Sequence, residues 1–289
     1  MTKQQIRVLV LGASGMLGNT VFRLFAKSPG FLTFGSMRSA DKLTFLAKDL
    51  HSRILTGVDV ENVDSLKSLF AKSRPDIVIN CIGLVKQLAG TDDPLLVIPI
   101  NALLPHRLAR LCEFAGARLI HISTDCVFSG KKGMYKESDV SDAIDLYGRS
   151  KYIGEVYYKH AITLRTSIIG HELLGSQSLL GWFLAQQNPV RGFRRAIFSG
   201  LPAVELALVI RDYVIPRPEL YGLYHVSTKP INKYELLQLI SNVYQKFIEI
   251  KPDDQLIIDR SLDSTLFCKA TDYHQKDWSE LIKSMHNFH

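Results

Sequence analysis

The sequence predicts an α/β protein built on a Rossmann-type doubly wound parallel sheet, with a smaller C-terminal lobe. Two observations support this. Short, nearly continuous apolar runs alternate with amphipathic stretches over the first 165 residues, and a glycine-rich turn follows the first apolar run. Parallel strands read as continuous apolar runs because helices cover both faces of their sheet.

The elements of the sheet can be placed in chain order. Strands are expected where apolar runs are bounded by turn residues, at Ile6–Leu11, Phe31–Met37, Arg53–Val58, Asp76–Cys81, Arg118–Ser123 and Ala161–Arg165. Helices are expected between them, at Met16–Lys27, Val63–Lys72, Leu95–Phe114 and Tyr147–His160. Pro99 and Pro105 make the start of the third helix irregular, and Gly116 ends it.

The regular alternation of apolar runs and amphipathic stretches ends at about Thr166. We therefore expect a Rossmann domain over residues 1–166, which would bind a ligand at the ends of its strands, and a mainly substrate-binding lobe over residues 167–289. Helices are expected in this lobe at Ser178–Gln187, Val204–Tyr213 and Asn232–Phe247, and the segment Asn188–Pro202 is rich in glycine, proline and arginine. One further strand, near residues 223–227, is expected to return to the main sheet.

Composition excludes several classes of function. The net charge is +7, but the dense basic groups are short, so no nucleic-acid partner is expected. No apolar run reaches the roughly 18 residues of a membrane helix, and the N-terminus does not resemble a signal peptide. The four cysteines have no metal-ligand spacing and are expected to be reduced thiols in a cytoplasmic protein.

The turn after the first strand has the pattern of a dinucleotide-binding site. Its sequence, Gly12-Ala13-Ser14-Gly15-Met16-Leu17-Gly18, places three glycines at the junction of a strand and a helix. The first glycine permits the tight turn, the second lets the backbone approach a pyrophosphate, and the third lets the helix pack on the sheet. The contacts expected here are Gly12, Ser14, Gly15, Met16, Leu17 and Gly18.

The end of the second strand favours NADPH over NADH. Folds that prefer NAD usually place an acidic residue there to bind the ribose hydroxyls, whereas this chain has Arg38, whose guanidinium suits a 2′-phosphate. Asp59 follows the third strand, where its carboxylate can accept hydrogen bonds from the adenine amine. The other expected cofactor contacts are Val60, Cys81, Ile82, Gly83 and Ile122.

Tyr147 and Lys151 form the candidate catalytic pair. Residues four apart share one face of a helix, and an ammonium beside a phenol lowers the pKa of the tyrosine. Free tyrosine titrates near 10, so a pKa near 7 requires roughly 4 kcal/mol of differential stabilisation. Such a tyrosine can protonate an oxygen while a hydride reaches the attached carbon.

Together these motifs resemble the extended short-chain dehydrogenase/reductase superfamily, and more closely the dTDP-4-dehydrorhamnose reductase family. The resemblance rests on Gly12 to Gly18, Asn80–Gly83, Ser123–Phe128, Tyr135 with Glu137, Tyr147–Lys151 with Gly154-Glu155, and Leu164–Ser167. It implies an NADPH-dependent reductase of a nucleotide-activated 4-keto-6-deoxy sugar, in deoxysugar biosynthesis for a surface polysaccharide. Tyr147 would then be the proton donor, Lys151 its partner and a ribose ligand, and Thr124 the hydroxyl that orients the carbonyl.

Three departures from the family pattern bear on the substrate. Cys126 replaces the usual tyrosine, and Ile168 replaces an aromatic substrate contact. Thr20 stands where some members carry a magnesium-binding glutamate, so no metal is expected. The resemblance makes Thr124, Asp125 and Ile168 candidate substrate contacts, and Arg191 with Arg194 and Arg195 are candidate diphosphate contacts.

Alternative functions remain open. The substrate can be a UDP-linked 2-acetamido-4-keto-6-deoxyhexose, or the enzyme can be a sugar-nucleotide epimerase that uses the same pair. A 4,6-dehydratase is disfavoured because Cys126 stands where its base glutamate belongs. A non-catalytic NADP-binding regulatory subunit is the alternative of another class, and a homodimer is left open.

Overall fold

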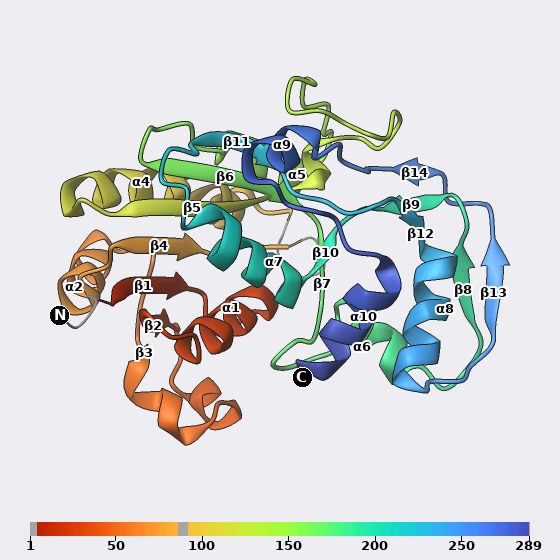
Figure 1. The fold of residues 1–289 in the computed structure, drawn as a ribbon, viewed down its shortest axis with the longest axis horizontal. Coiled ribbons are helices and arrows are strands. Elements are labelled where there is room, and N and C mark those ends of the chain that lie inside the picture. The colour runs from red at the N-terminus through yellow and green to blue at the C-terminus, as the bar shows by residue number, and fades with distance from the viewer. Residues whose placement is uncertain (1–4, 86–91, 289) are drawn as a thin grey trace. The chain divides into compact units, whose positions relative to one another are not determined.

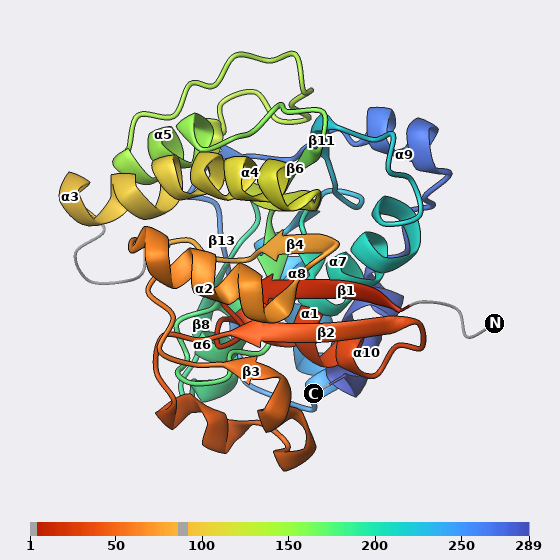
Figure 2. The same ribbon diagram turned by 90° about the vertical axis from the view of Figure 1, so that its left-hand side faces the viewer.

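A seven-stranded sheet forms the centre of the computed structural model, which describes residues 5–85 and 92–288. The strand order is β11-β6-β5-β4-β1-β2-β3 (Figures 1 and 2). These strands are β1 (Ile6–Leu11), β2 (Phe31–Ser36), β3 (Ile54–Leu55), β4 (Ile77–Asn80), β5 (Arg118–Thr124), β6 (Ala161–Thr166) and β11 (Gly222–His225). The pairings of β1 with β2 and β4, of β2 with β3, and of β4 with β5 are parallel. The expected Rossmann-type sheet is therefore confirmed.

The chain divides into two compact units. The first comprises Met1–Ser123, Asp145–Leu164 and Pro218–Leu223, and the second comprises Thr124–Ile144, Arg165–Arg217 and Tyr224–His289. The chain first enters the second unit at Thr124, returns to the first at Asp145 and enters the second again at Arg165. The segment Thr124–Ile144 also belongs to that unit, because its backbone bonds at Tyr135 join it to Ser261 and Asp263.

Helices cover both faces of the sheet in the first unit. Leu9 and Leu11 of β1 share an apolar core with α2 (Val63–Ser73) and α4 (Leu104–Ala115). On the opposite face, α1 (Met16–Ala26) packs so closely that a Cβ on Gly35 would be 3.1 Å from the Phe22 ring. Alternate side chains of the strands therefore meet different helices, as in a doubly wound fold.

The helix expected over Leu95–Phe114 has an irregular start. It begins as α3 (Pro94–Val97), continues as the π-helical η3 (Ile98–Leu103) and becomes α4. Gly116 ends it in a left-handed conformation, with φ +66°. The stretch Pro94–Ala115 is long and apolar enough to cross a membrane, but half of it is buried, as in a core helix of a folded domain.

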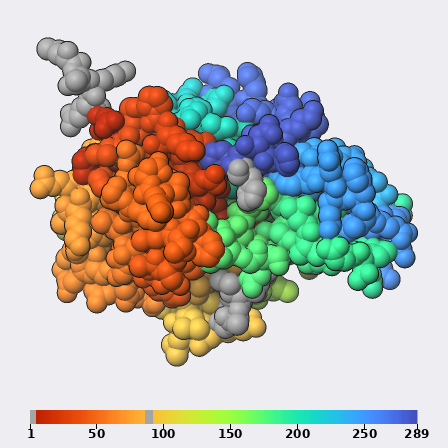
Figure 3. All heavy atoms as spheres, turned by 90° about the horizontal axis from the view of Figure 1, so that it is seen from below, coloured from red at the N-terminus to blue at the C-terminus, as the bar shows by residue number. Residues whose placement is uncertain are grey.

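Two elements of the first unit are shorter than the sequence suggests. The helix expected over Tyr147–His160 is α5 (Leu146–Ile153), because beyond Gly154 the backbone of Val156 exchanges both of its hydrogen bonds with the Thr163 hydroxyl. The strand expected over Arg53–Val58 is only β3 (Ile54–Leu55), which is followed by Gly57 at φ +71°. Between β2 and β3, the 3₁₀ helices η1 (Asp41–Phe45) and η2 (Lys48–Arg53) lie on the surface, in orange in Figure 3.

The second unit combines short strands and helices. The segment Asn188–Pro202 contains β8 (Val190–Phe193), β9 (Ala196–Phe198) and β10 (Leu201–Pro202), which pair with β13 (Ile250–Asp253), with β12 (Ile231–Asn232) and β14 (Ile258–Asp259), and with β7 (Ile168–Ile169). Its helices are η4 (Asp125–Val127), α6 (Leu179–Ala185), α7 (Ala203–Val209), η5 (Ile210–Val214), α8 (Lys233–Tyr244), α9 (Thr265–Thr271) and α10 (Trp278–Asn287). Phe128 stacks on Tyr135 in its core, and the buried Arg165 guanidinium lies over the Phe128 ring.

Candidate functional site

The glycine turn after β1 needs glycine at two of its three positions. Gly12 has φ +80°, a conformation that L side chains rarely adopt. A Cβ on Gly18 would lie 2.1 Å from the carbonyl oxygen of Gly12, which brings the first turn of α1 against the backbone of the loop. Gly15 is exposed, and a Cβ added to it would lie 3.5 Å from the carbonyl oxygen of Gly12, which is an ordinary van der Waals distance. Gly15 is thus left free for close approach by a ligand.

The N-terminus of α1 suits an anionic group. Gly15 is the N-cap and supplies no side-chain hydrogen bond, and the first turn contains no acidic residue. Backbone N–H groups at such a helix end carry partial positive charge that favours phosphate. Ser14 and Met16 are half-buried beside Gly15, whereas Leu17 is buried under the turn. The predicted phosphate contacts therefore lie together at this end of β1.

The ends of β2 and β3 place two further predicted residues on the surface. Arg38 is exposed and makes no hydrogen bond or ion pair with any residue that the structure describes. Its guanidinium is therefore available to an external anion such as a 2′-phosphate. Asp59 is exposed, and its Oδ1 accepts a hydrogen bond from the backbone N–H of Glu61, with Val60 half-buried beside it.

The loop after β4 is held in place by two buried asparagines. Asn80 Oδ1 accepts the N–H of Ile82, and Asn101 bonds both the N–H and the carbonyl of Leu84. Asn101 comes from the π-helical η3 and also donates to Ser150 Oγ in α5. The sequence analysis missed Asn101, whose polar side chain within an apolar helical stretch was the available signal.

Lys151 is a buried charged residue in the first unit, on the same helix as Tyr147. The N-cap Asp145 fixes the start of α5 by accepting the N–H of Gly148, and Tyr147 is half-buried on the first turn. Lys151 is 5% exposed, and its Nζ donates to the carbonyl of Ile122 at 2.8 Å. Burial lowers the pKa of Lys151 to about 8, against the opposing effects of Glu155 and Cys81.

The same lysine lies beside the loop after β4. A Cβ on Gly83 would be 3.8 Å from Lys151 Nζ and 3.5 Å from Asn101 Oδ1. Cys81 is half-buried there, and burial raises the pKa of its thiol to about 12, so it stays protonated at neutral pH. The structure thus brings together Lys151, Gly83 and Ile122, three residues that the sequence predicted for one site.

Thr124, which is predicted to supply a second catalytic hydroxyl group besides that of Tyr147, is the first residue of the second unit. Thr124 Oγ1 accepts the N–H of Cys126 and donates to Asp125 Oδ1. Burial raises the pKa of the Asp125 carboxyl, and the charge of Arg260 opposes this shift. Arg260 also donates to the carbonyl of Phe128 and, at 3.7 Å, to Cys126 Sγ. The sequence analysis missed Arg260 because its partners lie more than a hundred residues away.

Lys233 adds a second cation to this group. Burial lowers its pKa, and the charge of Asp125 opposes the shift. Two cations, Arg260 and Lys233, therefore interact electrostatically with the Asp125 carboxyl group.

The remaining substrate candidates lie elsewhere in the second unit. Ile168 is half-buried in β7, which pairs with β10. Arg191 is paired with Asp253, and Arg194 with Asp254, on the exposed side of β8 and β13. A diphosphate would have to compete with these aspartates, so Arg191 remains a prediction.

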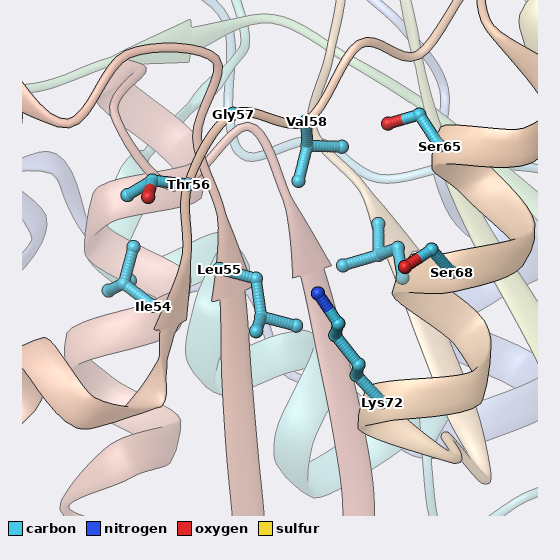
Figure 4. A pocket seen from close by; sticks show the side chains of 9 residues that line it. Ile54, Leu55, Thr56, Gly57, Val58, Ser65, Ser68 and Lys72 are labelled. Atoms are coloured by element: carbon cyan, nitrogen blue, oxygen red, sulfur yellow. The ribbon is translucent and has the colours of Figure 1, made fainter.

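A separate pocket of about 320 Å³ lies between β3 and α2 (Figure 4). Leu55, Val58 and Leu69 supply apolar lining, and Ser65, Ser68 and Lys72 supply polar groups from α2. None of the predicted cofactor or catalytic residues lines it.

The described part of the chain contains no group of three or more His, Cys, Asp or Glu residues arranged to hold a metal ion. Thr20 stands where some members of the resembled family carry a magnesium-binding glutamate. It is buried, and its hydroxyl donates a hydrogen bond to the carbonyl of Met16.

Comparison with known proteins gives a match over nearly the whole chain. A family model described as the RmlD substrate binding domain matches residues 6–285. A dTDP-4-dehydrorhamnose reductase of Aggregatibacter actinomycetemcomitans is 24% identical over 304 residues, covering 96% of this chain and 98% of that protein. The solved structure of a dTDP-4-dehydrorhamnose reductase from Bacillus anthracis in complex with NADP shares the fold, with a TM-score of 0.80, 21% identity and 99% of both chains covered.

Two other relatives match with different coverage. The probable low-salt glycan biosynthesis reductase Agl14 of Haloferax volcanii is 34% identical over 147 residues, which is 50% of this chain and 46% of that protein. The methionine adenosyltransferase 2 subunit beta of Xenopus tropicalis is 26% identical over 252 residues, covering 82% of this chain and 72% of that protein.

Proposed function

Because the chain belongs to the RmlD substrate-binding domain family, we propose that it is an NADPH-dependent reductase of a nucleotide-linked 4-keto-6-deoxy sugar. The observation that carries this proposal is Lys151, a buried ammonium one helical turn after Tyr147 and beside the loop that follows β4. A buried lysine next to a tyrosine, in a unit that also carries a dinucleotide turn, fits ketone reduction.

The residues of the first unit fit NADPH. The uncapped N-terminus of α1 can hold the pyrophosphate, and the exposed Arg38 can bind the 2′-phosphate, which disfavours NADH. When bound, NADPH supplies the hydride that reduces the C4 ketone.

Tyr147 and Lys151 divide the proton chemistry between them. Tyr147 holds a proton on its Oη and donates it to the ketone oxygen as negative charge develops there. The positive charge of Lys151 lowers the pKa of Tyr147 by favouring the phenolate. Thr124 would hold the ketone oxygen through its hydroxyl, in line with the family resemblance.

The sugar is proposed only as a class. The named reductase relatives support a dTDP-linked 4-dehydrorhamnose as the substrate. A role in deoxysugar biosynthesis for a surface polysaccharide is part of the proposal and follows from the family resemblance alone. Cys126 and Ile168 replace aromatic residues of the family, which leaves a UDP-linked 2-acetamido sugar as a second substrate of the same class.

A second candidate function is a non-catalytic NADP-binding subunit. The resemblance to a methionine adenosyltransferase beta subunit over 82% of the chain favours it. It predicts NADPH binding without ketone-dependent oxidation.

The experiment is a panel of dTDP- and UDP-linked 4-keto sugars, with NADPH oxidation followed by absorbance. We expect one class of ketone to be reduced, and Tyr147→Phe to lower kcat by about 10²-fold or more with nearly unchanged NADPH affinity. Tyr152→Phe is the matched control, because Tyr152 lies on the same helix but is 44% exposed. NADPH binding without oxidation by any ketone would favour the subunit, and full turnover by Tyr147→Phe would exclude its role as donor.

A further inference from the structure

A second buried charge lies beside Lys151 in the first unit. Glu155 follows α5, four residues beyond Lys151, and is only 2% exposed. Its Oε1 accepts a hydrogen bond from Ser123 Oγ at 2.7 Å, and its Oε2 accepts one from the Tyr157 hydroxyl at 3.3 Å. A buried carboxylate is costly unless it is hydrogen-bonded and close to positive charge, so its position calls for an explanation.

The side chains of Lys151 and Glu155 are hydrogen-bonded to consecutive residues of β5. Lys151 Nζ donates to the carbonyl of Ile122, and the next residue, Ser123, donates to the Glu155 carboxylate. The C-terminal end of α5 is therefore attached to β5 at two adjacent points, one through each charged side chain. The ammonium and the carboxylate are thus held at neighbouring residues near the end of β5.

We propose that Glu155 is a positioning residue for Lys151, and that its carboxylate, held by Ser123, keeps the Lys151 ammonium charged beside Tyr147. The inference rests on the proposed function, because it assigns a purpose to the charge of Lys151. Glu155 does not take part in proton transfer to the ketone. It acts through Lys151 alone.

Cys81 and His121, the other titratable groups that the structure describes around Lys151, do not supply this negative charge. Cys81, in the loop after β4, stays protonated because burial raises the pKa of its thiol to about 12. His121, on β5, stays neutral because burial and the charge of Lys151 hold its pKa well below the usual range. Burial lowers the pKa of Lys151, and the charge of Glu155 opposes that effect more than any other group.

The first test measures Tyr147 without substrate or cofactor. The phenolate absorbance of each variant is titrated with alkali, and the titration of the same protein carrying Tyr147→Phe is subtracted. If Glu155 acts through Lys151, removing its carboxylate lets Lys151 lose its charge at lower pH, and Tyr147 then loses the cation that favours its phenolate. We expect Glu155→Gln to raise the midpoint of the phenolate titration by about one pH unit. Glu155→Asp, which keeps the charge, should restore most of the wild-type value.

Two further variants separate this role from a structural one. Glu113→Gln removes the same charge from an exposed ion pair with Arg110 on α4 and should leave the midpoint unchanged. Ser123→Ala removes the hydrogen bond that holds the Glu155 carboxylate and should raise the midpoint by a smaller amount, which keeps the test usable if Glu155→Gln does not fold.

The second measurement is the pH profile of NADPH turnover, whose alkaline limb should move to lower pH with Glu155→Gln because Lys151 loses its charge there. A phenolate midpoint that is unchanged or lower in both Glu155→Gln and Ser123→Ala, or no titration assignable to Tyr147, would overturn the inference. Absence of ketone reduction by the wild-type protein would refute the proposed function, and the phenolate titration would still decide the role of Glu155.

Discussion

Replacing Gly18 by alanine tests the close packing of α1 on the glycine turn. The added Cβ would lie 2.1 Å from Gly12 O, 2.6 Å from Gly12 C and 3.2 Å from Ala13 N. All three atoms belong to the backbone, so no side-chain rotation can relieve the contact. Ordinary van der Waals contact begins at 3.4 Å, so the helix must move away from the turn by more than 1 Å.

The cost of this movement can be bounded. Overpacking of a close-packed interior typically costs about 1–3 kcal/mol, and alanine returns about 1 kcal/mol as a better helix former than glycine. We therefore expect Gly18→Ala to lower the free energy of unfolding by up to about 2 kcal/mol. The same displacement moves the backbone N–H groups of α1, so NADPH affinity should fall at least tenfold, or about 1.4 kcal/mol.

Urea denaturation and NADPH titration by fluorescence measure the two effects separately. Gly15→Ala is the matched control, because its Cβ would be 3.5 Å from Gly12 O and its φ is −85°. It should change stability by less than about 1 kcal/mol while still weakening NADPH, since the methyl group points to the exposed side where the phosphates are expected. Wild-type stability and wild-type NADPH affinity in Gly18→Ala would refute the reasoning.

Three other predictions concern single residues. Arg38→Ala should weaken NADPH at least roughly tenfold and NADH much less, because the guanidinium contacts only the 2′-phosphate; equal losses in binding titrations would remove the argument for NADPH. Burial and the charge of Arg165 lower the pKa of His225 to about 4 from 6.5, so between these pH values the unfolded chain binds the extra proton. The free energy of unfolding should therefore fall by up to about 3 kcal/mol from pH 6.5 to 4, and His225→Gln should reduce that slope in urea titrations at several pH values; an unreduced slope would contradict the assignment. Gly154→Ala would place a Cβ 2.0 Å from Asn101 O, separating α5 from η3, so kcat should fall more than NADPH affinity; unchanged kcat would show that Lys151 tolerates the shift.

The sequence predicted those features whose chemistry is local. The glycine turn, the Tyr147–Lys151 spacing and the order of strands and helices follow from residues close together in the chain, and the family and fold expected from them are confirmed. The functional roles of the site residues, including Thr124 and Arg191, stay predictions.

Contacts between distant residues could not be predicted. Ser123 and Glu155 are 32 positions apart, and Asn101 and Leu84 are 17 apart, so neither pair has a periodic signature. The end of α5 was also missed, because the hydrogen bonds that stop it come from Thr163 in β6. Likewise, the pairing of Tyr135 with Ser261 decides which unit holds residues 124–144, and the sequence carries no local sign of it.

The most direct test of the central claim follows the hydride itself. The protein is incubated with NADPH carrying deuterium at the transferable position of the nicotinamide and with the 4-keto sugar nucleotide that it reduces, and the product is examined by NMR. The account predicts deuterium at C4 of the sugar, and its loss in Tyr147→Phe. Deuterium at another carbon, or oxidation of NADPH with no deuterium in the sugar, would contradict it.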